Sequence, residues 1–71
     1  MARDICATLG ERIRQLRLAR GWRQIDLAEQ VGINENYVSD LELGKKEVCL
    51  RTIKALASAF GMSVADFLKT I

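Results

Sequence analysis

Hydrogen-bonding side chains are concentrated in one short stretch of the sequence, the string NENYVSD at residues 34–40. The carboxamide of Asn36 can donate and accept along one edge, which suits N6 and N7 of adenine. The carboxylate of Glu35 or Asp40 can accept from the amino group of cytosine, and Tyr37 can bond a phosphate or touch a thymine methyl. An equal alternative is that Glu35 and Asp40 cover a solvated helix face and that Tyr37 packs at a helix corner.

Groups suited to catalysis or metal binding are scarce. The sequence contains no His, which is the commonest general base and the commonest metal ligand. Cys6 and Cys49 are too few and too far apart for a disulfide framework or a zinc site. We therefore expect a protein that is not an enzyme, binds no metal or cofactor and has no evident small-molecule ligand. Both cysteines are expected to be small, buried or half-buried apolar residues.

The polar string lies in the second of two short amphipathic segments, residues 24–31 and 35–43, which carry apolar side chains at helical spacing. Between them, Gly32 can take the left-handed conformation that ends a helix, and Asn34 is a favoured N-cap. The pattern predicts two helices meeting at a large angle, a helix-turn-helix at residues 24–43. Side chains expected to face inward are those of Leu27, Ala28, Val31, Val38 and Leu41.

Three further helices are expected around this pair. The first is expected to begin near Thr8, because Thr8 and Glu11 have the spacing of a capping box, and to end at Gly21; an earlier start capped by Asp4 is the alternative. Trp22 is expected to close the core beside it. The other two helices are expected over residues 50–60 and from residue 63 onward. Apolar residues on the inner faces of these three helices are Leu9, Ile13, Leu16, Leu50, Ile53, Leu56, Ala57, Phe60 and Phe67.

Length and composition agree with this arrangement. Seventy-one residues, 49% of them apolar, suit one globular domain over residues 1–71, and no strand-like alternation occurs. The expected fold is therefore all-α, with five helices around one core. No run of about 18 apolar residues could span a membrane, and the first ten residues lack the apolar segment of a secretory signal. We expect a cytoplasmic protein.

Charge is distributed unevenly along the chain, although the net charge is only +2. Residues 1–23 contain six Arg against two acidic residues, whereas residues 24–49 contain two Lys against six acidic residues. A carboxylate near phosphates is repelled unless cations or base donors compensate it. If the polar string meets nucleic acid, the compensating cations must come from its edges. The candidates are Arg23, Lys45 and Lys46, with Arg12 or Arg20 as further contributors.

Taken together, the strings GERIRQLRLARGWRQIDLAEQVGINENYVSDLELGKK and LRTIKALASAFGMSVADFL resemble the Xre/Cro-type helix-turn-helix domain of phage repressors and small bacterial regulators. The resemblance covers roughly Leu9 to Leu68. It implies a compact, five-helix, lambda-repressor-like fold and a sequence-specific regulator of transcription that binds double-stranded DNA. The turn from Glu47 to Leu50 lacks the Asn-Pro-Ser often found there, and in this respect the chain resembles controller proteins of restriction–modification systems.

The resemblance also implies roles for individual residues. The second helix of the pair would enter the major groove, and its base-reading face would carry Glu35, Asn36, Tyr37, Ser39 and Asp40. Phosphate contacts would come from Arg23, Gln24, Asn34, Lys45 and Lys46. Arg17 and Glu42 would form a structural ion pair between the first and third helices. The sequence departs from the family at Arg23 and Cys49, where Ser or Thr caps are common, and at Leu43, where a polar or basic residue is frequent.

Proteins of this kind usually pair, so we expect a homodimer that reads an inverted-repeat operator. Candidate interface residues are Met62, Val64 and Ile71, whereas Phe67 is expected in the core; the alternative is that Val64, Phe67 and Leu68 simply complete the core. The competing interpretation of function is a protein-interaction or antitoxin-like module on a helix-turn-helix scaffold. The acidic charge of residues 24–49 motivates it.

Overall fold

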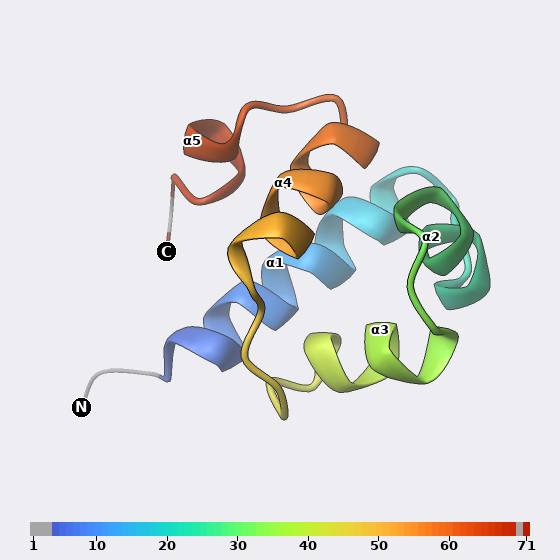
Figure 1. Cartoon of the computed structure of the whole chain (residues 1–71), viewed down its shortest axis with the longest axis horizontal. Helices are drawn as coiled ribbons and strands as arrows, with labels where there is room; N and C mark the ends of the chain where they lie inside the picture. Colours follow the sequence, from blue (N-terminus) through green and yellow to red (C-terminus); the bar gives the residue numbers. More distant parts are fainter. Residues whose placement is uncertain (1–3, 70) are drawn as a thin grey trace.

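The computed structural model describes residues 4–69 and 71. Over this part of the chain there is no strand, and Figure 1 shows α3 along one edge of the molecule, α5 on the opposite side and α1 running between them. The helices are α1 (Ile5–Ala19), α2 (Gln24–Val31), α3 (Glu35–Glu42), α4 (Leu50–Ala59) and α5 (Val64–Phe67). The predicted all-α, five-helix architecture is confirmed. Within the described residues, no helix is long and apolar enough to cross a membrane.

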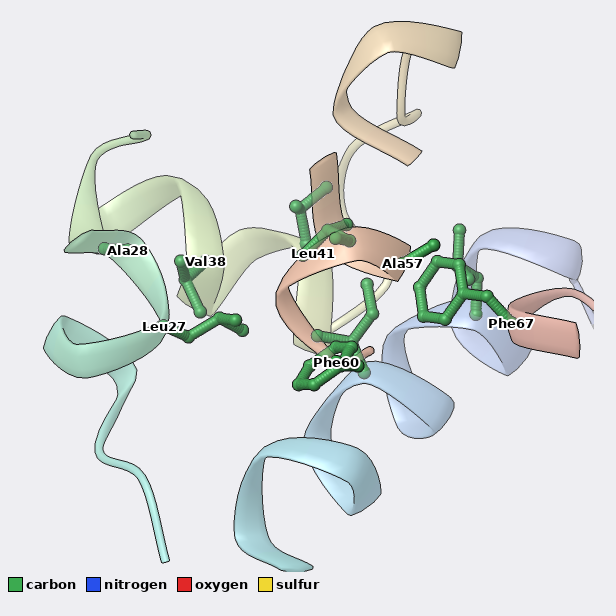
Figure 2. Packing of buried hydrophobic residues seen from close by; sticks show 10 residues of the cluster. Leu27, Ala28, Val38, Leu41, Ala57, Phe60 and Phe67 are labelled. Carbon is green, nitrogen blue, oxygen red and sulfur yellow. The ribbon is translucent and has the colours of Figure 1, made fainter. Parts of the chain in front are cut away.

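Every helix contributes one completely buried side chain to a common core. These five side chains, each 0% exposed, are Ile13, Leu27, Val38, Leu56 and Phe67. Figure 2 shows side chains from separate helices meeting in this cluster. Burying a large apolar side chain contributes about 1.5–3 kcal/mol. Because the core draws on all five helices, removing any one of them would expose apolar surface on its neighbours.

Aromatic rings close one side of this core. Trp22, in the turn after α1, stacks on Phe60 with ring centroids 6.0 Å apart and an interplanar angle of 22°. Phe60 in turn contacts Phe67 at 6.1 Å between centroids. The predictions that Phe67 lies in the core and that Trp22 covers the corner after the first helix are confirmed. The three rings link the end of α1 to α4 and α5.

Helix α1 begins one turn earlier than its capping-box pattern predicted. Its first residue is Ile5, and Asp4 stands at the N-cap position without a side-chain cap bond. Thr8 lies inside the helix, where its backbone N–H and its hydroxyl donate to Asp4 O at 3.1 and 3.3 Å. The start at Thr8 is therefore wrong, and the alternative start at Asp4 is correct. The reason is that this first turn packs against the fold: Cys6 and Ala7 are half-buried, and Ala7 lies so near Gly44 that a Cβ on Gly44 would sit 2.8 Å from Ala7 Cα.

Two predictions at the start of α4 are also wrong. Leu50 was expected on the inner stripe but is 75% exposed, because it is the first residue of α4 and the buried stripe begins one turn later, at Ile53. Cys49, the N-cap residue, is exposed rather than buried, whereas Cys6 is half-buried as expected. Cys49 Sγ lies 3.2 Å from Thr52 Oγ1, and this hydrogen bond lowers the pKa of the thiol.

Two guanidinium groups, those of Arg12 in α1 and of Arg20 directly after it, bind the C-terminal ends of the last two helices. Arg12 Nε donates to Phe67 O and Arg12 Nη2 to Asp66 O, each at 3.0 Å. Arg20 Nη2 donates to Phe60 O at the end of α4, and its Cζ lies 5.0 Å from the centroid of the Phe60 ring. The last carbonyls of a helix have no partner within the helix. Arg12 and Arg20, which were candidate phosphate contacts, are thus occupied inside the fold.

Candidate nucleic-acid interface

The turn between α2 and α3 is short because Gly32 ends α2 and, two residues later, Asn34 caps the start of α3. Gly32 ends α2 with φ of 79°, and its N–H donates to Ala28 O at 2.8 Å. The left-handed backbone conformation that ends a helix here strongly favours Gly over other residues. Asn34 then caps α3, since its Oδ1 accepts from the N–H of Asn36 at 2.7 Å. The side chain of Asn34 is therefore engaged at the helix start.

Helix α3 has a buried face and a solvent face. Val38 and Leu41 are almost fully buried and pack in the core. Of the residues predicted to read bases, the two at the helix start, Glu35 and Asn36, are exposed. The other three are half-buried: Tyr37, Ser39 and Asp40. The hydroxyl of Tyr37 donates to Glu47 O at 3.3 Å, and its ring packs beside the core. Tyr37 thus joins α3 to the loop that follows it.

A buried ion pair fixes the far end of α3 to α1. Arg17 Nε donates to Glu42 Oε2 at 2.6 Å and Arg17 Nη2 to Glu42 Oε1 at 3.1 Å, with side-chain exposures of 9% and 4%. Arg17 Nη1 also donates to Trp22 O at 2.7 Å. Gln24 Nε2, at the start of α2, donates to Glu42 Oε1 at 3.1 Å. One carboxylate therefore connects three helices.

Close backbone contact reinforces this junction. Gly10 of α1 lies so near α3 that a Cβ there would sit 2.7 Å from Glu42 O and would overlap Leu41 O. Real Cβ atoms do not approach oxygen that closely, so α1 and α3 can cross at this distance only with Gly at the contact. The sequence signal was a Gly inside a helical pattern, which often marks a packing requirement. It was missed in the sequence-based prediction.

The basic side chains predicted to bind phosphate occupy two places. Lys45 and Lys46 are exposed in the loop after α3. Arg23, just before α2, forms an ion pair with Asp26, with Arg23 Nη2 3.0 Å from Asp26 Oδ1, although its side chain is 78% exposed. The hydrogen bonds from Arg23, first from its side chain and then from its backbone N–H, hold the pKa of Asp26 below its ordinary range. The carboxylate of Asp26 thus accepts the N–H of Arg23, the N-cap residue of α2, as the third residue of a capping box does.

The residues predicted to form a dimer interface are only partly exposed. Met62, Val64 and Ile71 are half-buried and pack against the core. Large apolar side chains that are mainly exposed lie elsewhere, at Ile5, Leu18, Leu43 and Leu50. No group of three or more His, Cys, Asp or Glu within the described residues could hold a metal ion.

A polar hollow of about 300 Å³ lies between α1 and α3, beside the buried ion pair. Its lining residues are Arg14, Arg17, Gln24, Ser39, Glu42 and Leu43. Arg14 was not singled out from the sequence, because its position depends on where α3 ends relative to α1. The hollow adjoins the half-buried Ser39 on α3.

The order of these helices, with α2 and α3 joined by a three-residue turn and α3 held by α1, defines a helix-turn-helix protein. The chain belongs to the helix-turn-helix family, whose sequence pattern matches residues 13–67. This membership confirms the resemblance to Xre/Cro-type regulators.

Two relatives and one solved structure illustrate the likeness. The HTH-type transcriptional regulator DdrOP3 of Deinococcus deserti is 43% identical over 63 residues, or 89% of this chain, which spans only 49% of that protein. The control protein C.BamHI of Bacillus amyloliquefaciens is 32% identical over 96% of this chain and 85% of its own length. The crystal structure of the restriction-modification controller protein C.AhdI from Aeromonas hydrophila has a TM-score of 0.83 and 34% identity, over 87% of this chain and 94% of that one.

Proposed function

We propose that this chain is a sequence-specific, double-stranded DNA-binding regulator of transcription that inserts α3 into the major groove. The observation that carries the proposal is the arrangement of α3. Its apolar face is buried, its end is fixed by Glu42, and Glu35 and Asn36 at its start are exposed. Recognition helices of this class contact base edges with residues near their N-terminus. The relatives, a transcriptional regulator and two controller proteins, support the same function.

The contacts divide by chemistry. Asn36 pairs with an adenine edge, Glu35 or Asp40 accepts from cytosine, and Tyr37 and Ser39 contact neighbouring bases or phosphates. Phosphates are bound by Arg23, Gln24, Asn34, Lys45 and Lys46. Gln24 retains one carboxamide N–H beyond its bond to Glu42, and the N–H groups at the start of α2 add to the anion site. The DNA ligand implies that the protein acts in the cytoplasm.

Residues 1–71 act as one helix-turn-helix domain, and two copies bind an inverted repeat. Two recognition helices then lie about 34 Å apart in successive major grooves. Met62, Val64 and Ile71 contribute the apolar part of the dimer contact through the surface that each leaves exposed. A two-fold dimer places the same patch of both copies at the contact.

Binding-site selection on random duplexes tests the function and the dimer together. An inverted repeat in the selected sequences is the expected result. On the selected site, Asn36→Ala should weaken binding by about 1–3 kcal/mol and leave non-specific binding unchanged. Gln30→Ala removes an exposed carboxamide from α2 and serves as the matched control. Unchanged affinity for both Asn36→Ala and Gln24→Ala would show that this docking mode is wrong.

A protein-interaction or antitoxin-like module is the second candidate, motivated by the six acidic residues within residues 24–49. A gel shift with pooled genomic fragments at two salt concentrations separates the two functions. A retarded complex at low salt that weakens at high salt supports DNA binding, because phosphate contacts release counterions. Absence of any complex at low salt would favour the interaction module.

A further inference from the structure

The arginines of the N-terminal region differ in what their guanidinium groups bind. Four of the five within residues 4–23 are engaged with acceptors of the protein: Arg12 and Arg20 with helix-end carbonyls, Arg17 with Glu42 and Arg23 with Asp26. Arg14 is the exception. It forms no hydrogen bond or ion pair with any residue that the structure describes, and it is exposed on α1.

Arg14 lies at the junction of two neighbouring hollows between α1 and α3. The first is the polar hollow of about 300 Å³ beside Gln24 and Ser39. The second has a volume of about 430 Å³ and is lined by Ala7, Glu11, Arg14, Glu42 and Leu43. Because Arg14, Glu42 and Leu43 line both, the two hollows adjoin one another along the groove between the two helices. We call it the α1–α3 groove.

The charges at the Gln24 side of this groove favour an anion. Glu42 is the one carboxylate that lines the first hollow, and Arg17 already neutralises it at 2.6 Å. Arg14 therefore adds an uncompensated positive charge there, whereas the surrounding segment, residues 24–49, is acidic overall. A guanidinium presents a planar fork of donors that matches two oxygens of a phosphate.

Helix α3 itself contributes no cation to the groove, which its C-terminal part lines with Ser39, Glu42 and Leu43. Leu43, the C-cap residue of α3, is 63% exposed and carries no polar group. Arg14 reaches the same groove from the neighbouring helix. It can thus place a positive charge at the end of α3 that the sequence of α3 does not supply.

We propose that Arg14 binds a phosphate of the DNA backbone in the α1–α3 groove, so that α1 contributes a contact beside that of Gln24. The inference rests on the proposed function, since it needs DNA as the ligand. A phosphate contact positions the protein and carries no sequence information. Arg14 therefore raises affinity for all DNA sequences alike, and its contribution depends on salt.

Salt titration of DNA binding tests this assignment. The probe is a fluorescent duplex of arbitrary sequence, titrated with the full chain between 50 and 200 mM salt. Each phosphate contact contributes about 0.9 to the slope of log affinity against log salt, which is about a 3.5-fold change in affinity over this range per bound protomer. Arg14→Gln should lose that portion of the slope, and Arg14→Lys should keep it. Lys54→Gln, which removes one exposed charge from α4 outside the groove, should match the wild type.

The outcomes separate the inference from the proposed function. A wild-type slope in Arg14→Gln, or an equal reduction in Arg14→Gln and Lys54→Gln, would overturn the role of Arg14 while DNA binding stands. No binding by the wild type at any salt would overturn the proposed function itself.

A second measurement needs no variant. The Nε–Hε resonance of Arg14 in ¹⁵N-labelled wild-type protein should shift when the duplex is added. A resonance that does not move while others respond would contradict the contact.

Discussion

The two ends of α3 are held in contrasting ways. At its C-terminal end, Glu42 is bound by Arg17 and Gln24, and the backbone crosses α1 at the contact with Gly10. At its N-terminal end, Glu35 and Asn36 are exposed, and the side-chain contact that fixes the helix start is the local cap made by Asn34. One end is part of the protein interior, and the other faces solvent.

This difference separates stability from recognition along a single eight-residue helix. Residues at the fixed end cannot change without disturbing α1, α2 and the core. Residues at the exposed end can change with little effect on folding, because side chains without such partners usually alter stability by less than about 0.5 kcal/mol. A helix built in this way can acquire a new base preference while keeping its position.

The largest effect is expected from Glu42→Ala. The substitution leaves the guanidinium of Arg17 buried with only Trp22 O as its remaining acceptor. Removing one partner of a buried ion pair costs about 3–5 kcal/mol. Chemical denaturation should show this loss, and Glu35→Ala on the same helix should stay within about 0.5 kcal/mol of the wild type. Equal stabilities of the two variants would remove the distinction between the two ends.

Gly10→Ala should have the next largest effect on stability, and whether it stabilises or destabilises the fold is the decisive observation. In a helix without close neighbours, Ala in place of Gly stabilises by about 1 kcal/mol. Here the added Cβ meets the carbonyl oxygens of Leu41 and Glu42, so α1 and α3 must separate. Overpacking of this kind destabilises by about 1–3 kcal/mol. A thermal midpoint above that of the wild type would show that the helices do not cross as closely as described.

Asn34→Ala should cost about 1 kcal/mol, because the N–H of Asn36 loses its acceptor. The matched control is Cys49→Ala, since Cys49 is the N-cap residue of α4 and makes no side-chain cap bond. Its effect should be smaller. Urea unfolding of both variants would check the order, and a larger loss for Cys49→Ala would contradict the assigned cap.

The smallest effect concerns pH at the start of α2. The bonds from Arg23 lower the pKa of Asp26 in the folded state, so the folded state binds the proton less readily than the unfolded chain does. The stabilisation is therefore present above the ordinary Asp pKa of about 3.9 and is lost as pH falls through the lower, folded value. The free energy of unfolding of wild type and Asp26→Asn should converge below about pH 4. A gap that persists unchanged into acid would rule out this cap.

Local patterns in the sequence sufficed for the helix-turn-helix. Gly32 and Asn34 mark the turn because their conformational preferences act within a few residues, and Val38 and Leu41 mark the inner face by spacing alone. The wrong start of α1 has a related cause. Thr8 and Glu11 satisfied a local rule, but packing of Ala7 against Gly44, a tertiary contact, accompanies the extra turn before them.

What the sequence could not supply depends on contacts between distant segments. Arg12 and Phe67 are 55 residues apart, and nothing near Arg12 indicates that its acceptor is a carbonyl at the end of another helix. Judged by charge alone, Arg12, Arg14 and Arg20 were equivalent. Only the packed helices show that two of them bind carbonyls and that Arg14 lines a groove. The site residues proposed to touch DNA stay predictions until a complex is measured.

The bonds of Arg12 and Arg20 to the ends of α5 and α4 have a consequence for synthesis on the ribosome. The chain emerges N-terminus first at about 5–20 residues per second. Helix α1 therefore appears early, but the acceptors of these two arginines, Phe60, Asp66 and Phe67, appear only with the last residues of the sequence. Until then the guanidinium groups of Arg12 and Arg20 lack these acceptors. Packing of these two side chains must therefore wait until residues 60–67 have been made, and by then the first 49 residues, with eight acidic against eight basic side chains, carry no net charge.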